Sequence, residues 1–236
     1  MLKVNTNRFL EKRIQSNMDK SIEYKKTSKQ RQDFKYDNKR KKNLEIQHQN
    51  QNIISQTIAE LKLTNHSFIL EIECNNSRHL PFLFQQAKGI GYYGVSFSDK
   101  PMDEIPLVQA LKINEGHAEF INIKEGEKLN FESDFFDCCF TANTIYYWSD
   151  PLSTFKEIYR TLRLGGTFNL SFIEQKFGKD LPWTQTDFTF YTLNQIKTMY
   201  RIAGFGDLEV IQMTEEVMTK DGQHMVRPFI YISGRK

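Results

Sequence analysis

Polar side chains occur at regular spacing in a turn where a nucleotide-type ligand would need bare backbone. Residues 68–77 read FILEIECNNS, an apolar strand that runs into a tight turn ahead of a helix. In open parallel sheets that bind nucleotides, this turn carries glycines, because the backbone must approach the ligand closely. Glu73, Asn75 and Ser77 occupy those three positions here. Asn75 is the mildest change, since asparagine tolerates positive φ better than most residues.

The rest of residues 44–236 predicts alternating strands and helices. Apolar spacing predicts a helix over about 44–61, and Pro106 suits the first position of a short helix. A protein whose strands are separated by helical segments forms a parallel sheet with right-handed crossovers. The predicted strands are 68–73, 91–96, 117–122, 135–141, 167–173, about 207–213 and about 226–233.

Capping signals set the predicted helix ends. Asn76 or Ser77 is expected to cap the helix after the first strand. Asp150 followed by proline predicts the start of another helix, which the pair Gly165-Gly166 should end just before the strand at 167. Residues 192–195, TLNQ, have the form of a capping box, and that helix should run to Gly204.

The first 43 residues differ in composition from the rest. Residues 1–50 carry 14 Lys/Arg against 6 Asp/Glu, a net charge of +8, whereas residues 51–236 carry 18 against 23, a net charge of −5. Residues 20–43 have too few apolar side chains to order themselves, so we expect residues 1–43 to form a basic, flexible extension ahead of a domain at 44–236. A solvated tail and an arm for RNA or a protein partner both remain open.

Several classes of protein are disfavoured. There is no run of 18 apolar residues, so no membrane-spanning helix is expected. The start has no secretory signal; a weak amphipathic stripe allows a mitochondrial presequence, but Glu11 and Asp19 favour a cytoplasmic protein. The three cysteines have no metal-ligand spacing, and we expect Cys138 and Cys139 to be buried in a reducing compartment.

Two longer segments carry a family resemblance. Residues 136–148, FDCCFTANTIYYW, and residues 155–166, FKEIYRTLRLGG, resemble the fourth strand and the following helix-turn of class I S-adenosylmethionine (SAM)-dependent methyltransferases of the type 11 group. Leu164 replaces the family's proline before the glycine pair. The resemblance, which covers about residue 44 to the C-terminus, implies an α/β, Rossmann-like sheet of seven strands in the order 3-2-1-4-5-7-6, with the last strand antiparallel.

The resemblance implies a cofactor site at the carboxyl ends of the first two strands, although its motifs are degenerate here. Glu71 matches the acidic residue of the first strand, whereas Glu73, Asn75 and Ser77 replace the three glycines. A carboxylate at position 73, if it faced the carboxylate of SAM at about 4 Å, would be repelled by about 4 kcal/mol at an effective dielectric of 20.

Three further positions are implied to be cofactor residues. Ser96 replaces the acidic residue that holds both ribose hydroxyls in the family, Glu125 matches the acidic residue near the adenine amino group, and Asn143 matches a position whose backbone lies near the sulfonium. Each lost charge-assisted hydrogen bond is worth about 1.5–3 kcal/mol, so losing two would weaken binding about 10²- to 10⁴-fold.

Aromatic residues are the substrate-side candidates. Tyr146, Tyr147 and Trp148 follow the fourth predicted strand, and Trp183 lies in a segment, LPWTQ, that resembles small-molecule members of the family. Aromatic residues after a buried strand more often pack in the core, so both roles remain open. The motifs assign no catalytic residue and no metal ligand.

Three functions remain open. The first is a methyltransferase-fold protein whose SAM binding is weakened or lost and which acts as a binding or scaffold subunit, docked through residues 1–43. The second is an active SAM-dependent methyltransferase that acts on a small molecule mostly by positioning the two reactants. The third is a relaxed site for a different nucleotide or metabolite.

Overall fold

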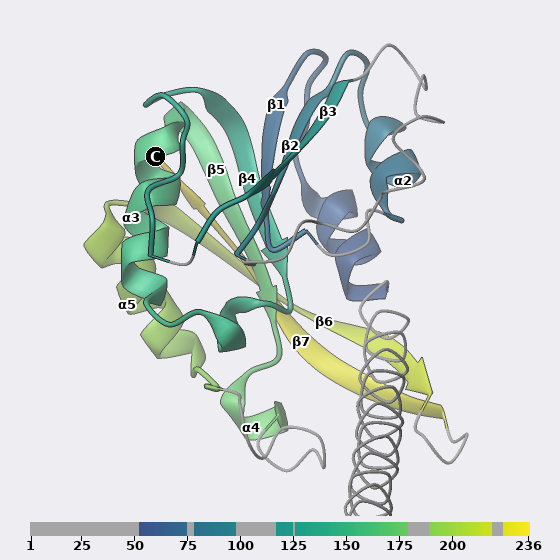
Figure 1. Cartoon of the computed structure of the whole chain (residues 1–236). Helices are drawn as coiled ribbons and strands as arrows, with labels where there is room; N and C mark the ends of the chain where they lie inside the picture. Colours follow the sequence, from purple (N-terminus) through teal and green to yellow (C-terminus); the bar gives the residue numbers. More distant parts are fainter. Residues whose placement is uncertain (1–51, 75–77, 98–116, 125, 179–188, 219–223) are drawn as a thin grey trace, which may run out of the picture. The chain divides into compact units, whose positions relative to one another are not determined.

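The seven-stranded sheet predicted from the sequence is present (Figure 1). The computed structural model describes residues 52–74, 78–97, 117–124, 126–178, 189–218 and 224–236. The strand order is β3-β2-β1-β4-β5-β7-β6. Neighbours from β3 to β5 pair in parallel, and β7 pairs antiparallel with both β5 and β6. The strands are β1 (Phe68–Ile72), β2 (Gly91–Ser96), β3 (His117–Asn122), β4 (Phe136–Ala142), β5 (Leu162–Phe172), β6 (Gly206–Met218) and β7 (His224–Arg235).

Helices lie on both faces of the sheet (Figure 1). On one side are the helical residues 52–60 and α2 (Leu80–Phe84); on the other are α3 (Pro151–Thr161) and α5 (Leu193–Ala203). The 3₁₀ turn η2 (Ile145–Tyr147) and α4 (Gln175–Gly178) follow the carboxyl ends of β4 and β5. The predicted helix near Pro106 lies outside the described residues.

The core between the sheet, α3 and α5 is aromatic. Phe155 of α3 contacts Phe168 of β5 and Tyr200 of α5, each with ring centroids 5.0 Å apart. The Tyr200 hydroxyl lies 3.2 Å from the carbonyl oxygens of both Phe168 and Ile232, so the one buried polar atom of this ring is satisfied. Gly234 makes room for that ring, because a Cβ there would lie 2.6 Å from Tyr200.

The predicted caps of α3 and α5 are confirmed. The Asp150 side chain accepts a hydrogen bond from the Ser153 N–H, and Pro151 stands at the start of α3. Thr192 and Gln195 form the capping box of α5, and Gly204 ends that helix at φ 111°. Because these signals act between near neighbours in the chain, they could be read from the sequence.

Two predicted helix ends are wrong. The N-cap of α2 is His79, with no side-chain cap bond, instead of Asn76 or Ser77. α3 ends at Thr161, and β5 begins at Leu162, before the glycine pair rather than after it. Gly165 has φ 82° and lies where the register of β5 against β4 shifts. The glycine pair therefore belongs to a bulge-like irregularity within β5 and does not end a helix.

The outer strands extend farther than predicted. β6 and β7 pair from Gly206↔Arg235 to Met218↔His224, beyond the end of β5. Arg227 and Glu215 form a buried ion pair across this hairpin, with an N–O distance of 2.5 Å. Side-chain amides of the helical residues Asn52 and Gln56 donate to the carbonyl oxygens of Glu216 and Thr214, so the start of this helix contacts β6.

Candidate functional site

Glu71, in β1, is at the centre of a buried polar cluster. Its Oε2 accepts a hydrogen bond from the Tyr92 hydroxyl at 2.5 Å and lies 2.7 Å from Nε2 of His79. The three side chains come from β1, β2 and the start of α2, and Glu71 is only 3% exposed. Through these two contacts, Glu71 links β1 to β2 and to the start of α2.

Cys74 completes this cluster beneath the turn. A Cβ at Gly94 would lie 2.6 Å from the Cys74 sulfur and 2.8 Å from the Tyr92 hydroxyl oxygen, so a larger residue there would displace the cluster. Burial, and then the charge of Glu71, raise the pKa of both the Tyr92 hydroxyl and the Cys74 thiol. Both groups are therefore neutral at physiological pH, and Tyr92 remains a hydrogen-bond donor.

Glu73 directly follows β1 and keeps a glycine-like backbone at φ 60°. Its Oε1 accepts a hydrogen bond of 2.8 Å from the N–H of Phe97, the first residue after β2. The Glu73 side chain thus extends from the carboxyl end of β1 to that of β2. Ser96, the last residue of β2, is half-buried and pairs with Asn122 of β3.

The carboxyl end of β4 is fixed by backbone and hydroxyl contacts. Asn143 has φ 61°, and its N–H donates to the carbonyl oxygen of Ser171 at 2.8 Å. The Thr141 hydroxyl donates to the Ile72 carbonyl oxygen at 2.8 Å and lies 2.6 Å from that of Thr144. These contacts join the ends of β1, β4 and β5, so the chain after β4 has a fixed path.

The three aromatic residues after β4 differ in exposure. Tyr146 is 4% exposed and its hydroxyl oxygen accepts from the Ile173 N–H; Trp148 is also 4% exposed and lies edge-on to Phe97. Tyr147 is 51% exposed. Tyr146 and Trp148 therefore pack in the core, and Tyr147 is the ring that solvent reaches.

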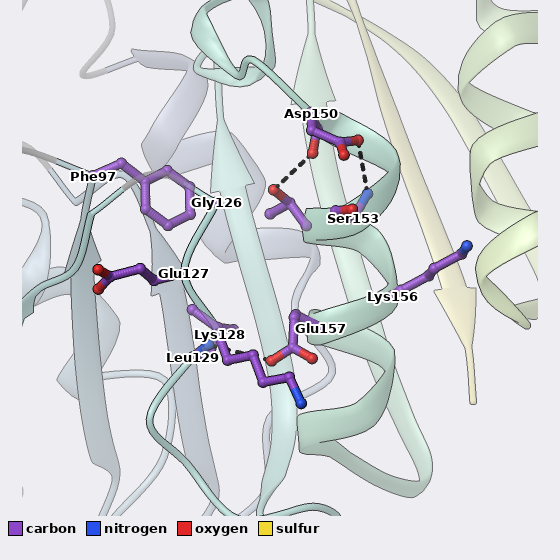
Figure 2. A pocket seen from close by; sticks show the side chains of 10 residues that line it. Phe97, Gly126, Glu127, Lys128, Leu129, Asp150, Ser153, Lys156 and Glu157 are labelled. Atoms are coloured by element: carbon purple, nitrogen blue, oxygen red, sulfur yellow. Dashed lines mark hydrogen bonds between the residues drawn. The ribbon is translucent and has the colours of Figure 1, made fainter.

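A cavity of about 320 Å³ lies beside the end of β2 (Figure 2). It is lined by Phe97, by the loop 126–129 that follows β3, and by the first half of α3. The α3 side chains that line it are Ser153, Thr154, Lys156 and Glu157, with Asp150 at the cap.

Arg160 holds the wall of this cavity in place. Its guanidinium donates to the carbonyl oxygens of Leu129 and Phe131, each at 2.9 Å, and pairs with Glu157. Glu157 in turn accepts from the Leu129 N–H at 3.2 Å. The loop after β3 is therefore tied to α3, which fixes the two walls of the cavity relative to each other.

Some candidates from the sequence lie outside the described residues, namely Asn75, Ser77, Glu125 and Trp183. Of the others, Glu73 and Ser96 lie at the ends of β1 and β2, Glu71 lies in the buried cluster, and Asn143 and the aromatic residues lie after β4. Glu73 and Ser96 do not line the cavity, although both adjoin Phe97, which does. Among the described residues there is no cluster of side chains that could hold a metal ion, and no helix long and apolar enough to cross a membrane.

Sequence reasoning missed His79, Tyr92 and Phe97. Tyr92 lies on the same face of the sheet as Glu71, and only the β1–β2 register, Ile69↔Tyr92, brings the two together. Phe97 could have been found, because it directly follows a correctly predicted strand. Ligands of open α/β sheets bind at the carboxyl ends of the strands, so this position was a candidate. His79 belongs to no recognisable motif in the sequence, so nothing there indicated its contact with Glu71.

Comparisons with known proteins agree with this fold. Residues 70–170 match the family model of the methyltransferase domain. A 48-residue stretch is 50% identical to 2-methyl-6-phytyl-1,4-hydroquinone methyltransferase 2, chloroplastic, of Oryza sativa subsp. japonica, and covers 20% of this chain and 14% of that protein. A 98-residue stretch is 35% identical to the biotin biosynthesis bifunctional protein BioHC of Teredinibacter turnerae. It covers 38% of this chain and 17% of that protein. The matches thus span less than a fifth of these relatives.

Solved structures share the architecture at low sequence identity. A putative methyltransferase from Haloferax volcanii, solved in complex with the Trm112 methyltransferase activator, has a TM-score of 0.65 at 16% identity, over 80% of this chain and 90% of that one. Phosphoethanolamine N-methyltransferase 2 of Haemonchus contortus, solved with SAM, has a TM-score of 0.56 at 17% identity. The alignment covers 80% of this chain and 52% of that one. The resemblance to class I SAM-dependent methyltransferases is confirmed.

Proposed function

We propose that this chain binds an adenosyl ligand at the carboxyl ends of β1 and β2, with weakened affinity for SAM, and acts as a binding subunit. The observation that carries the proposal is the place of the cavity. It lies beside Phe97, directly after β2, and ligands of open α/β sheets bind outside the carboxyl ends of the strands. Its volume of about 320 Å³ lies within the range of small-molecule sites.

The cavity suits the base of the ligand. The Phe97 ring lines it beside Gly126 and Glu127, and α3 with the Asp150 cap forms the facing wall (Figure 2). Aromatic rings give a base a stacking partner, worth about 1–3 kcal/mol by alanine substitution in nucleic-acid sites. In this arrangement the ribose lies toward Ser96 and Glu73, where the strands end.

The expected weakness has two causes. Ser96 lacks the carboxylate that the family resemblance implies for ribose, and Glu73, Asn75 and Ser77 add side chains to a turn that needs bare backbone. Losing two charge-assisted hydrogen bonds would raise a micromolar Kd to about 100 μM or more.

The binding-subunit role also implies a partner. The Haloferax volcanii neighbour was solved with an activator protein, and residues 1–50 of this chain carry a net charge of +8. We propose that residues 1–43 dock the protein onto RNA or an acidic protein surface, in the cytoplasm.

Calorimetric titration with SAM and S-adenosylhomocysteine tests the proposal. We expect saturable binding with a Kd of about 100 μM or more. At a Kd of about 100 μM, ligand at about 1 mM should raise the free energy of unfolding by about 1.4 kcal/mol, measured by denaturation. Phe97→Ala should weaken binding, whereas Phe82→Ala, a similar change of an exposed ring on α2, should not. No response at millimolar ligand would refute adenosyl binding, and a response to ATP alone would indicate a different nucleotide.

A second function is favoured by one comparison. The 48-residue match at 50% identity is to a methyltransferase named for a phytyl-substituted hydroquinone, so an active small-molecule methyltransferase is the alternative. Micromolar SAM binding, together with transfer of a labelled methyl group to a quinol or amine, would support that alternative over the binding subunit.

A further inference from the structure

A side-chain contact joins the end of β1 to the edge of the cavity. We call the Glu73 side chain, with the hydrogen bond that it accepts from the Phe97 N–H, the Glu73 bridge. We infer that the cavity selects a flat heteroaromatic base such as adenine, and that the Glu73 bridge excludes the part of an adenosyl ligand that extends beyond the base. The inference rests on the proposed place of the base in the cavity and deepens it by naming the class of ligand.

The cavity occupies one end of the crevice along the sheet. Its described lining residues are Phe97 and members of the segments 126–129 and 150–157, and none of them belongs to β1 (Figure 2). Its volume of about 320 Å³ lies at the lower end of the range for small-molecule sites. The cavity therefore suits a base, and the rest of an adenosyl ligand would have to continue along the carboxyl ends of the strands toward β1.

The Glu73 bridge lies on that path. β1 and β2 pair in parallel with Ile72 opposite Val95, so Glu73 and Ser96 are the next residues of the two strands. Oε1 of Glu73 accepts the Phe97 N–H at 2.8 Å, which places the side chain across the gap between the strand ends. A ligand that runs from the cavity to the turn after β1 must displace this side chain. Because a hydrogen bond to a charged group is broken, its affinity falls about ten- to hundredfold.

The same contact favours the binding of a base. Glu73 holds the backbone of Phe97, and the Phe97 ring lies edge-on to the buried ring of Trp148, with centroids 6.4 Å apart. A ring that is already held in place loses little conformational freedom when a base stacks on it. A free base can use the Phe97 ring without disturbing the Glu73 bridge, whereas a longer ligand cannot.

Calorimetric titration with adenine and with S-adenosylhomocysteine tests the inference on the wild type and on Glu73→Gly. Glycine suits the φ of 60° at this position, so the variant should fold. We expect the wild type to bind adenine at least as tightly as S-adenosylhomocysteine. Glu73→Gly should tighten S-adenosylhomocysteine about ten- to hundredfold relative to adenine. Glu132→Gly, the same change at an exposed residue that does not line the cavity, should leave the ratio of the two Kd values unchanged.

A second variant separates the bridge from its charge. Glu73→Gln keeps the length of the side chain and an acceptor oxygen for the Phe97 N–H, so most of the preference for adenine should remain. If Glu73→Gln raises the relative affinity for S-adenosylhomocysteine as much as Glu73→Gly does, the charge and not the bridge excludes the longer ligand, and the inference is overturned.

The wild-type titrations distinguish failure of the inference from failure of the proposed function. Tighter binding of S-adenosylhomocysteine than of adenine would overturn the inference and leave the proposed function standing. Adenine binding without any response to S-adenosylhomocysteine would support the inference and refute the proposed adenosyl ligand. A protein that binds neither compound would refute both.

Discussion

At the residue scale, the Glu71 carboxylate shows how this chain keeps a charge inside its core. A buried carboxylate is costly unless it is hydrogen-bonded. Glu71 meets this need through Tyr92 and His79, which lie 21 and 8 residues away in the sequence. The cluster fixes the turn that carries Glu73, although no member of it faces the cavity.

Tyr92→Phe removes one hydrogen bond to this carboxylate and keeps the ring. We expect the free energy of unfolding to fall by about 1.5–3 kcal/mol, the usual range for a hydrogen bond to a charged group, measured by urea denaturation. Tyr93→Phe, the same change at the half-buried neighbour, should cost less than about 0.5 kcal/mol. Equal losses in the two variants would show that the cluster does not stabilise the fold.

At the element scale, α3 depends on the Asp150 cap that also borders the cavity. The hydrogen bond from the Ser153 N–H lowers the pKa of the Asp150 carboxyl below its ordinary value of 3.8. A carboxyl whose pKa is depressed on folding stabilises the protein above its unfolded pKa, and this contribution is lost as the pH falls through the folded pKa.

Asp150→Ala should therefore destabilise the protein by about 0.5–2 kcal/mol at pH 7, the range for a lost N-cap. Asp150→Asn should cost less, because asparagine also caps helices. The difference between aspartate and asparagine should begin to shrink as the pH falls below the unfolded pKa of about 3.9, and it disappears only once the pH has passed the lowered folded pKa. Denaturation from pH 7 to pH 3 measures this, and a difference that does not shrink over that range would contradict the charge-based explanation.

Signals between near neighbours predicted the elements well. β2 and β3 match their predicted bounds to the residue, and the caps of α3 and α5 are where the sequence placed them. The role of Gly165 was misread because its positive φ serves the irregular start of β5, which depends on pairing with β4. The Glu73–Phe97 contact could not be predicted, because it requires the direction of a side chain across two strands.

At the scale of the whole molecule, the chain combines a mildly acidic domain with a basic leading segment. Residues 1–43 lie outside the described part of the structure, and their proposed role rests on charge alone. Binding to a polyanion through clustered lysine and arginine is salt-dependent, because each neutralised phosphate releases counterions.

Removal of residues 1–43 should leave the urea midpoint of the remaining chain unchanged and abolish its binding to single-stranded RNA. For the full chain, binding should weaken steeply between 50 and 200 mM salt, with a slope of about −0.7 per phosphate neutralised. Fluorescence anisotropy with a labelled oligonucleotide measures both. Loss of the folded state on truncation, or RNA binding by the truncated chain, would contradict this division of roles.

The amides of Asn52 and Gln56, which donate to β6 carbonyl oxygens, have a consequence for self-association. Exposed strand edges are templates for joining another chain, and β6 is an edge strand of this sheet. A second copy that added a strand along this part of β6 would compete with the two amides for the carbonyl oxygens of Thr214 and Glu216. The helix that carries the amides therefore opposes strand-to-strand association at that end of the edge.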